Sequence, residues 1–326
     1  MRRLISLVLV VVLCVISLLG AAPTTHAAPD LAQGMQISPV LVDLNTDRGK
    51  TYDLKISVMN VTTGDLVFSS FINDFQAKDE TGDPEVLIDT NLPESASLVK
   101  WVKPLGTVAL KAKQSKDLIV RVTIPADAEP GGHYGVVRFS GTAPGLQQNG
   151  VSLAASAGML LLVRVSGNIK ESLITKDFFT ERGDRRSVWF ENGPIKFVQR
   201  ITNNGNVHVK PLGDVVITSM TGSNIGTVHV NDKKGNILPG STRRFEETLN
   251  KKRLFGRYTA TASLAYGTQG QVLIASTTFW VIPYKLIIAA LLLIILLVLL
   301  LRFMLRRYNQ KVIKKAQRET NRRNFR

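Results

Sequence analysis

The sequence predicts an all-β protein: two tandem immunoglobulin-like β-sandwiches followed by one transmembrane α-helix. Apolar and polar residues alternate strictly in several short segments before residue 281, as half-buried strands require; the clearest are residues 52–58, 118–124, 195–202 and 258–264. Turn motifs containing Gly, Asn and Asp separate these segments. Short strands at such spacing favour antiparallel sandwiches. By contrast, the sixteen residues of Leu286–Leu301 have no polar side chain, which indicates a membrane-spanning helix.

Residues 1–27 are predicted to be a secretory signal peptide. Arg2 and Arg3 precede an apolar stretch, and small residues occupy positions −3 and −1 of a cleavage site after Ala27. An uncleaved second anchor is the alternative interpretation. The single cysteine, Cys14, lies in this segment, so the mature chain would have no disulfide and would depend on packing alone.

Residues 34–166 and 167–280 are predicted to form the two sandwiches, the first distal and the second membrane-proximal. Each has an early strand that ends in an Asn-containing turn and a later strand that opens with Gly-x-Tyr. The tyrosines, Tyr134 and Tyr258, are structural candidates for a tyrosine corner, in which the ring packs inward and the hydroxyl bonds upstream backbone. A loop rich in Gly, Gln and Asn, residues 142–150, is expected to lie exposed at one end of the first sandwich.

Residues 284–305 are predicted to cross the membrane, because a helix of this length spans about 33 Å. Residues 306–326 would form a basic cytoplasmic tail. From Arg302 onward the chain has ten basic residues and one acid, and such an excess marks the cytoplasmic side. The expected product is a single-pass protein of the cell membrane with an extracellular N-terminal ectodomain.

The net charge of +16 does not indicate nucleic-acid binding, because most of it lies in the tail. Residues 28–284 carry only +4 of that charge, which is ordinary for an exported segment. The basic tail is explained by topology and by anionic lipid headgroups.

No motif in the sequence predicts an enzyme or a cofactor. His133 is expected in a turn and half exposed, while His208 and His229 could approach each other as a weak metal site. Trp101 is the tentative ligand-contact residue, because an exposed tryptophan can stack on a sugar; the alternative is a core residue. An acidic stretch could bind calcium, but a solvated hairpin tip is the simpler interpretation; its members are Asp74, Asp79, Glu80, Asp83, Glu85 and Asp89.

Residues 35–140 resemble the N-terminal domain of the WxL-interacting protein family. The matching positions include Ile37-Ser38-Pro39-Val40, Trp101-Val102 and the segment 124–134, in that order. The resemblance implies a cell-surface immunoglobulin-like module proposed to bind peptidoglycan, carried on a membrane-anchored protein whose second ectodomain meets a partner protein. The matching positions lie in the first predicted sandwich only.

Two functions remain open at this point. The leading interpretation is a membrane-anchored bacterial cell-surface binding protein whose distal domain engages peptidoglycan or a surface-protein partner. The alternative is a chaperone-like assembly factor that holds exported subunits at the membrane. Main-chain pairing between an edge strand and a partner strand would suit either function.

Overall fold

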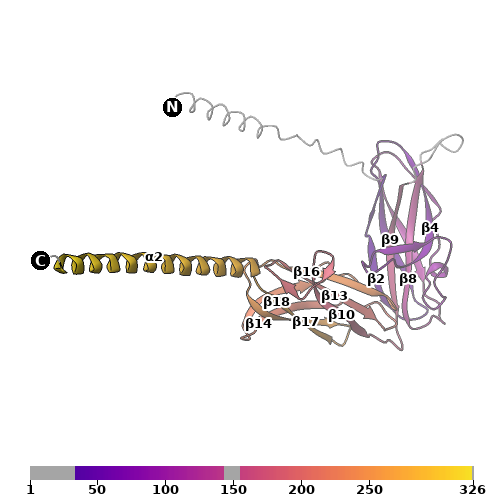
Figure 1. Ribbon diagram of the computed structural model, residues 1–326. Helices are drawn as coiled ribbons and strands as arrows, with labels where there is room; N and C mark the ends of the chain where they lie inside the picture. Colours follow the sequence, from indigo (N-terminus) through magenta and orange to yellow (C-terminus); the bar gives the residue numbers. More distant parts are fainter. Residues whose placement is uncertain (1–33, 143–154, 325–326) are drawn as a thin grey trace, which may run out of the picture.

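The computed structural model describes residues 34–142 and 155–324, and it confirms the predicted fold class: two β-sandwiches followed by one long helix (Figure 1). The predicted signal peptide and most of the 142–150 loop lie outside the described residues. The strands of the first sandwich run across those of the second, so the two sandwiches meet at an angle (Figure 1).

The first sandwich packs a three-stranded sheet, ordered β1-β3-β7, against a sheet ordered β2-β9-β8-β4-β5, with β6 also paired to β4. A short 3-10 turn, Val99–Trp101, connects the layers near their edge. The strands are β1 Met35–Ser38, β2 Leu41–Thr46, β3 Thr51–Asn60, β4 Leu66–Ala77, β5 Pro84–Leu87, β6 Thr107–Leu110, β7 Ser115–Thr123, β8 Gly131–Thr142 and β9 Ala155–Val165.

The chain changes sheets between its first two strands. β1 pairs antiparallel with β3 in one sheet, whereas β2 pairs parallel with β9 in the other. Fully buried side chains such as Ile56, Phe68 and Phe139 fill the space between the sheets. Because β2 begins at Leu41, it covers only the part of β9 from Leu160 to Val165.

The second sandwich packs a sheet ordered β11-β10-β13-β16 against one ordered β12-β18-β17-β14-β15. Aromatic rings meet in its core, where Phe279 contacts Phe190, Phe197 and Tyr258. Its strands are β10 Leu173–Arg182, β11 Arg185–Arg186, β12 Trp189–Phe190, β13 Ile195–Asn203, β14 Leu212–Ser219, β15 Asn224–Val230, β16 Thr242–Leu249, β17 Gly256–Tyr266 and β18 Gln271–Val281.

The helix α2 spans Tyr284–Asn324 and follows β18 after only two residues. Its segment Tyr284–Gln310 is apolar and long enough to cross a bilayer, and none of that segment is buried against the sandwiches. Pro283 stands immediately before the helix, where its missing N–H costs nothing. The second sandwich and α2 are therefore joined almost without a linker.

Two buried asparagines occupy equivalent places in the two sandwiches. Asn60 ends β3 and Asn203 ends β13, and neither is exposed to solvent. The Asn203 amide donates to the carbonyls of Val207 and Ile237 at 2.7 and 2.8 Å, and its oxygen accepts the N–H of Gly205. Asn60 makes the same kind of contacts in its own turn. Each side-chain amide thus forms hydrogen bonds with buried backbone groups that are not paired within a sheet.

We expect Asn203→Ala to destabilise the protein by about 2–4 kcal/mol, because it leaves buried carbonyl groups without donors. Thermal or denaturant unfolding of the full chain measures this loss. Asn204→Ala is the matched control: Asn204 is exposed, and we expect its loss to change the unfolding free energy by less than about 0.5 kcal/mol. Equal losses for the two variants would contradict the clamping role of Asn203.

Candidate functional site

Trp101 lies in the core of the first sandwich rather than on its surface. Its side chain is 8% exposed, and its ring centroid stands 4.2 Å from that of His133. A sugar could stack on Trp101 only after the side chains around it had moved. The position predicted as a ligand contact therefore acts as packing between the two sheets.

The expectation that His133 is half exposed in a turn is wrong. His133 lies inside β8 and is completely buried beside Trp101. Its Nε2 donates to the carbonyl of Glu129 at 3.0 Å, and burial lowers its pKa because the charged form would be desolvated. A neutral, buried imidazole of this kind is a core residue.

The two tyrosine-corner candidates are placed differently. The Tyr258 hydroxyl contacts the N–H and carbonyl of Phe255 at 2.9 and 3.0 Å, so it holds backbone just upstream. The Tyr134 ring instead points away from the core of the first sandwich, and its hydroxyl lies 3.3 Å from Nδ1 of His208 in the second sandwich. Burial raises the pKa of Tyr134 well above its ordinary value, so the hydroxyl keeps its proton.

The acidic stretch does not gather around one point. Asp74 is buried and accepts the backbone N–H groups of Leu92 and Leu98, whereas Glu80 reaches the second sandwich. His229 likewise pairs with Asp214 on the exposed face of β14 and β15 rather than with His208. Within residues 34–142 and 155–324, no three metal-ligating side chains form a cluster.

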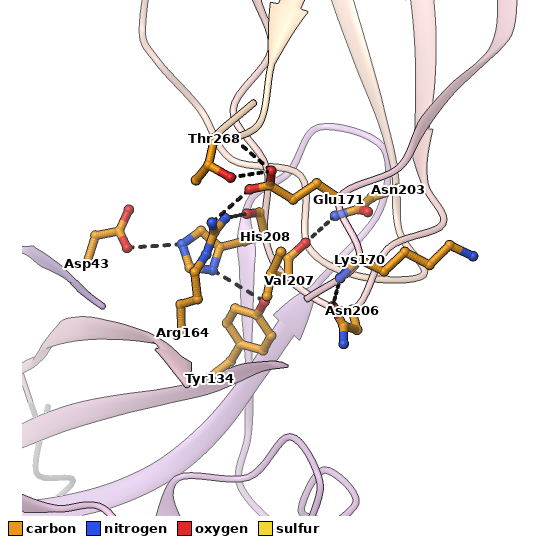
Figure 2. A network of polar contacts seen from close by, with 10 residues as sticks. All are labelled: Asp43, Tyr134, Arg164, Lys170, Glu171, Asn203, Asn206, Val207, His208 and Thr268. Carbon is orange, nitrogen blue, oxygen red and sulfur yellow. Dashed lines mark hydrogen bonds and ion pairs between the residues drawn. The ribbon is translucent and has the colours of Figure 1, made fainter. Parts of the chain in front are cut away.

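A hydrogen-bonded chain joins the two sandwiches at Tyr134 (Figure 2). His208, which is 4% exposed, presents Nδ1 to the Tyr134 hydroxyl and Nε2 to the carboxylate of Asp43 at 3.0 Å. Hydrogen bonding from His208 lowers the pKa of Asp43, so this carboxylate stays ionised. Tyr134 and Asp43 of the first sandwich thus bind the two ring nitrogens of His208 in the second sandwich.

Arg164 and Glu171 form a second part of the same contact. Arg164, at the end of β9, donates to Glu171 at 2.7 Å and to the carbonyl of His208 at 3.1 Å (Figure 2). Glu171 also accepts the N–H and hydroxyl of Thr268. Burial alone would raise the pKa of Glu171, but the bonds from Thr268 and Arg164 outweigh it and lower the pKa. A buried ion pair with every oxygen satisfied fixes geometry well.

A separate contact lies at the tip of the β4–β5 hairpin. Glu80 forms a bidentate ion pair with Arg200 on β13, which also bonds Asp177 at 2.7 Å. The Glu80 carbonyl accepts the backbone N–H of Arg244 at 2.7 Å. Gly82 has a φ of +77°, a left-handed conformation that glycine adopts without strain, and it lies against the guanidinium of Arg243.

A cleft of about 700 Å³ lies between the sandwiches and is lined by both of them. Its walls include Phe75, Tyr134, the turn 129–132 and the segment 238–241. The hairpin contact and the Tyr134–His208 contact each join the sandwiches near this cleft. The two attachments are separate, so rotation of the sandwiches about one contact would break the other; we call this junction the elbow.

The edge of β9 is open on one side over its first half. Leu160 donates its N–H to the carbonyl of Val40, and β2 pairs with β9 only from there onward. Because backbone groups alternate in direction along a strand, those of Ser156 and Gly158 face the same side as Leu160. β1 lies close by but pairs with β3. Among the described residues, no strand pairs with this part of the edge.

This open edge has no charged side chain. The sequence is uncharged from residue 151 to residue 163, and Val40 and Leu41 beside it are 67% and 41% exposed. The edge strand β7, by contrast, presents Lys116, Asp117 and Arg121, which discourage a second chain from pairing. The open segment of β9 is therefore the candidate functional site. It belongs to the first sandwich, which the elbow attaches to the second.

No family model and no curated protein matches the chain. Among solved structures, the chain is similar to the class 5 fimbriae chaperone CfaA, with 17% identity, 74% of this chain and 98% of that chain covered, and a TM-score of 0.38. The E. coli chaperone DraB shares 12% identity over 76% and 94% of the two chains, with a TM-score of 0.34. The Pseudomonas aeruginosa CupB2 chaperone shares 10% over 76% and 100%, with a TM-score of 0.35. Likenesses this distant leave the partners of this chain open.

We expect Arg200→Gln to loosen the hairpin tip, because it removes the ion pair with Glu80 at the junction. Amide hydrogen exchange of residues 78–83 should rise roughly tenfold, as a loss of about 1.4 kcal/mol would cause. Arg121→Gln is the matched control, since it removes a bidentate ion pair with Asp53. That pair is exposed to solvent and joins two strands of the first sandwich only. Unchanged exchange in Arg200→Gln would show that the pair does not hold the hairpin.

The junction should be stable at neutral pH and weaken only in acid. The folded pKa of Glu171 is lowered from its ordinary value of 4.5, so its ionised form contributes stability above pH 4.5, and that contribution is lost as the pH falls through the lowered value. We expect the melting-temperature difference between the native chain and Glu171→Gln to stay constant from pH 7 to pH 5 and to shrink below pH 4.5. A difference that already shrinks above pH 5 would mean a raised pKa.

Proposed function

We propose that this protein is anchored in the cell membrane by α2 and holds an extended segment of another exported protein, which adds a strand to the open edge of β9. This proposal combines the surface-protein partner of the leading interpretation with the holding role of the chaperone-like alternative. The observation that carries it is the uncharged edge of β9, which no strand pairs among the described residues, on a frame of two sandwiches attached at two places.

The anchor is argued from α2 and its charges. The apolar segment Tyr284–Gln310 is fully exposed in the absence of lipid, and an exposed surface of this size needs a bilayer to cover it. Basic residues follow it and are expected on the cytoplasmic side. Both sandwiches then lie outside the cytoplasm, where an exported protein is the available partner.

The mode of binding is argued from the edge. A peptide paired with β9 would bond the N–H and carbonyl groups of Ser156 and Gly158, which supplies affinity largely independent of sequence. The exposed side chains of Val40 and Leu41, where β2 begins, would give the peptide an apolar contact. A chaperone-like factor needs such tolerance if it holds more than one subunit.

Binding of peptidoglycan remains a separate proposal that rests on the family resemblance. Trp101, the residue chosen for sugar stacking, is buried, so this role would need another surface of the first sandwich. Retention of the solubilised full chain on purified cell wall tests it independently of the β9 edge.

The test of strand addition uses a variant that removes one N–H at the open edge. We expect Ser156→Pro to abolish partner binding, because proline cannot donate and its ring obstructs pairing, while its ladder with β8 persists. A photo-reactive amino acid at Val40 in the full chain, in cells that make the protein, should cross-link exported proteins, and mass spectrometry identifies them.

The matched control is Ser156→Thr, which keeps the N–H and should cross-link like the native chain. The loss in Ser156→Pro should exceed tenfold, since one donor disappears and the proline ring also obstructs pairing beside it. Cross-linking that is equal in both variants, or absent from the native chain, contradicts strand addition. Retention on cell wall that is the same in both variants would support the glycan role instead.

A further inference from the structure

The end of the second sandwich from which α2 emerges gathers segments far apart in the sequence. Ile195 pairs with Leu249 in one sheet, and Gly256 pairs with Val281 in the other. These strand ends therefore lie beside the start of the helix. Ser219 pairs with Tyr258, which places the β14–β15 turn at the same end. Figure 1 shows α2 leaving this end, opposite the first sandwich.

This end is strongly basic. We call its exposed cationic side chains the basic collar, and they are Arg182, Arg185, Arg186, Lys251, Lys252, Arg253, Arg257 and Lys285. Within residues 182–194, 250–257 and 280–285 the only acids are Asp184 and Glu191. Glu191 is already bound to Lys285 at 2.8 Å. The collar therefore presents a large excess of positive charge.

Exposed apolar side chains lie among these charges. Phe255 is 70% exposed, Met220 is 76% exposed and Trp189 is 55% exposed. Trp189 stacks on Trp280 with ring centroids 5.6 Å apart. Tryptophan is enriched where protein meets the headgroup region of a bilayer, and an aromatic side chain with basic neighbours is typical of interfacial binding.

The collar is held at a fixed height relative to α2. The N–H of Ile282 bonds the carbonyl of Phe190 at 2.8 Å, and the N–H of Trp280 bonds that of Val188 at 2.7 Å. Only Ile282 and Pro283 separate β18 from the helix. A bilayer crossed by α2 would therefore meet the collar directly, because no flexible linker can move the sandwich away.

We propose that the basic collar binds the outer surface of an anionic bilayer and so fixes the direction in which the ectodomain points. The occupant is a lipid surface containing anionic headgroups, as the charge of the collar and its continuity with α2 require. This inference rests on the membrane anchor of the proposed function, but not on strand addition at β9. Basic residues on the outer side are compatible with the predicted orientation, because folded domains are exported largely regardless of their charge.

The test reconstitutes the full chain in nanodiscs of phosphatidylcholine alone or with phosphatidylglycerol. A cysteine is placed at Phe255 in a chain whose Cys14 is replaced by Ser, and its reaction with a water-soluble maleimide is timed. In anionic nanodiscs we expect the reaction of Phe255→Cys to slow by roughly fivefold or more, which is the effect of one or two basic residues near such a surface. The triple variant Lys251→Gln, Lys252→Gln and Arg253→Gln should remove most of that slowing.

Two controls make the result specific. Ile274→Cys tests a position with similar exposure, since the native Ile274 side chain is 67% exposed. Ile274 lies on β18 far from the end that leads into α2, so this cysteine should react at the same rate in both kinds of nanodisc. Exchanging Lys50, Lys103 and Lys116 of the first sandwich for Gln should leave the slowing at Phe255→Cys intact.

The outcomes separate the inference from the anchor. A chain that does not co-elute with nanodiscs would overturn the membrane anchor itself. A chain that co-elutes but reacts at Phe255→Cys at the same rate in both lipids would overturn the collar alone. Slowing that survives the triple variant would also overturn it, because the lipid effect would then not depend on these charges.

Discussion

The architecture depends on the double attachment between the two sandwiches. His208 is held between Tyr134 and Asp43 on one side, and Glu80 is held by Arg200 on the other. Either contact alone would allow the sandwiches to pivot about it. Together they attach the first sandwich to the second at two separate places, so a pivot about one contact would break the other.

The kinds of contact suit this role. An interface between two domains of one chain is ordinarily modest in area and polar, and relative motion is the usual expectation. Here the Glu171 side chain is 5% exposed, and Arg164 and Thr268 satisfy both of its carboxylate oxygens. A buried ion pair adds little net stability, yet breaking it leaves a costly unpaired charge, so it favours one arrangement over all others.

The sequence was sufficient for the helix and for the clearest strands, but not for the junction. Strict alternation predicted half-buried strands, and the repeated Asn turns marked the positions of Asn60 and Asn203. Alternation failed at β8, where residues 131–137 are all buried because one face meets the first core and the other meets the second sandwich. That is why His133 was misplaced. Arg200 and Glu80 lie 120 residues apart, and no local pattern pairs them.

The distribution of charge connects the two ends of the ectodomain. Edge strands such as β7 present charged side chains that prevent pairing with another chain. The first half of β9 has no such protection, although an unprotected edge is an aggregation hazard in a free protein. The anchor and the basic collar that we propose would present the protein to other copies of itself in restricted orientations, and would thereby reduce this hazard.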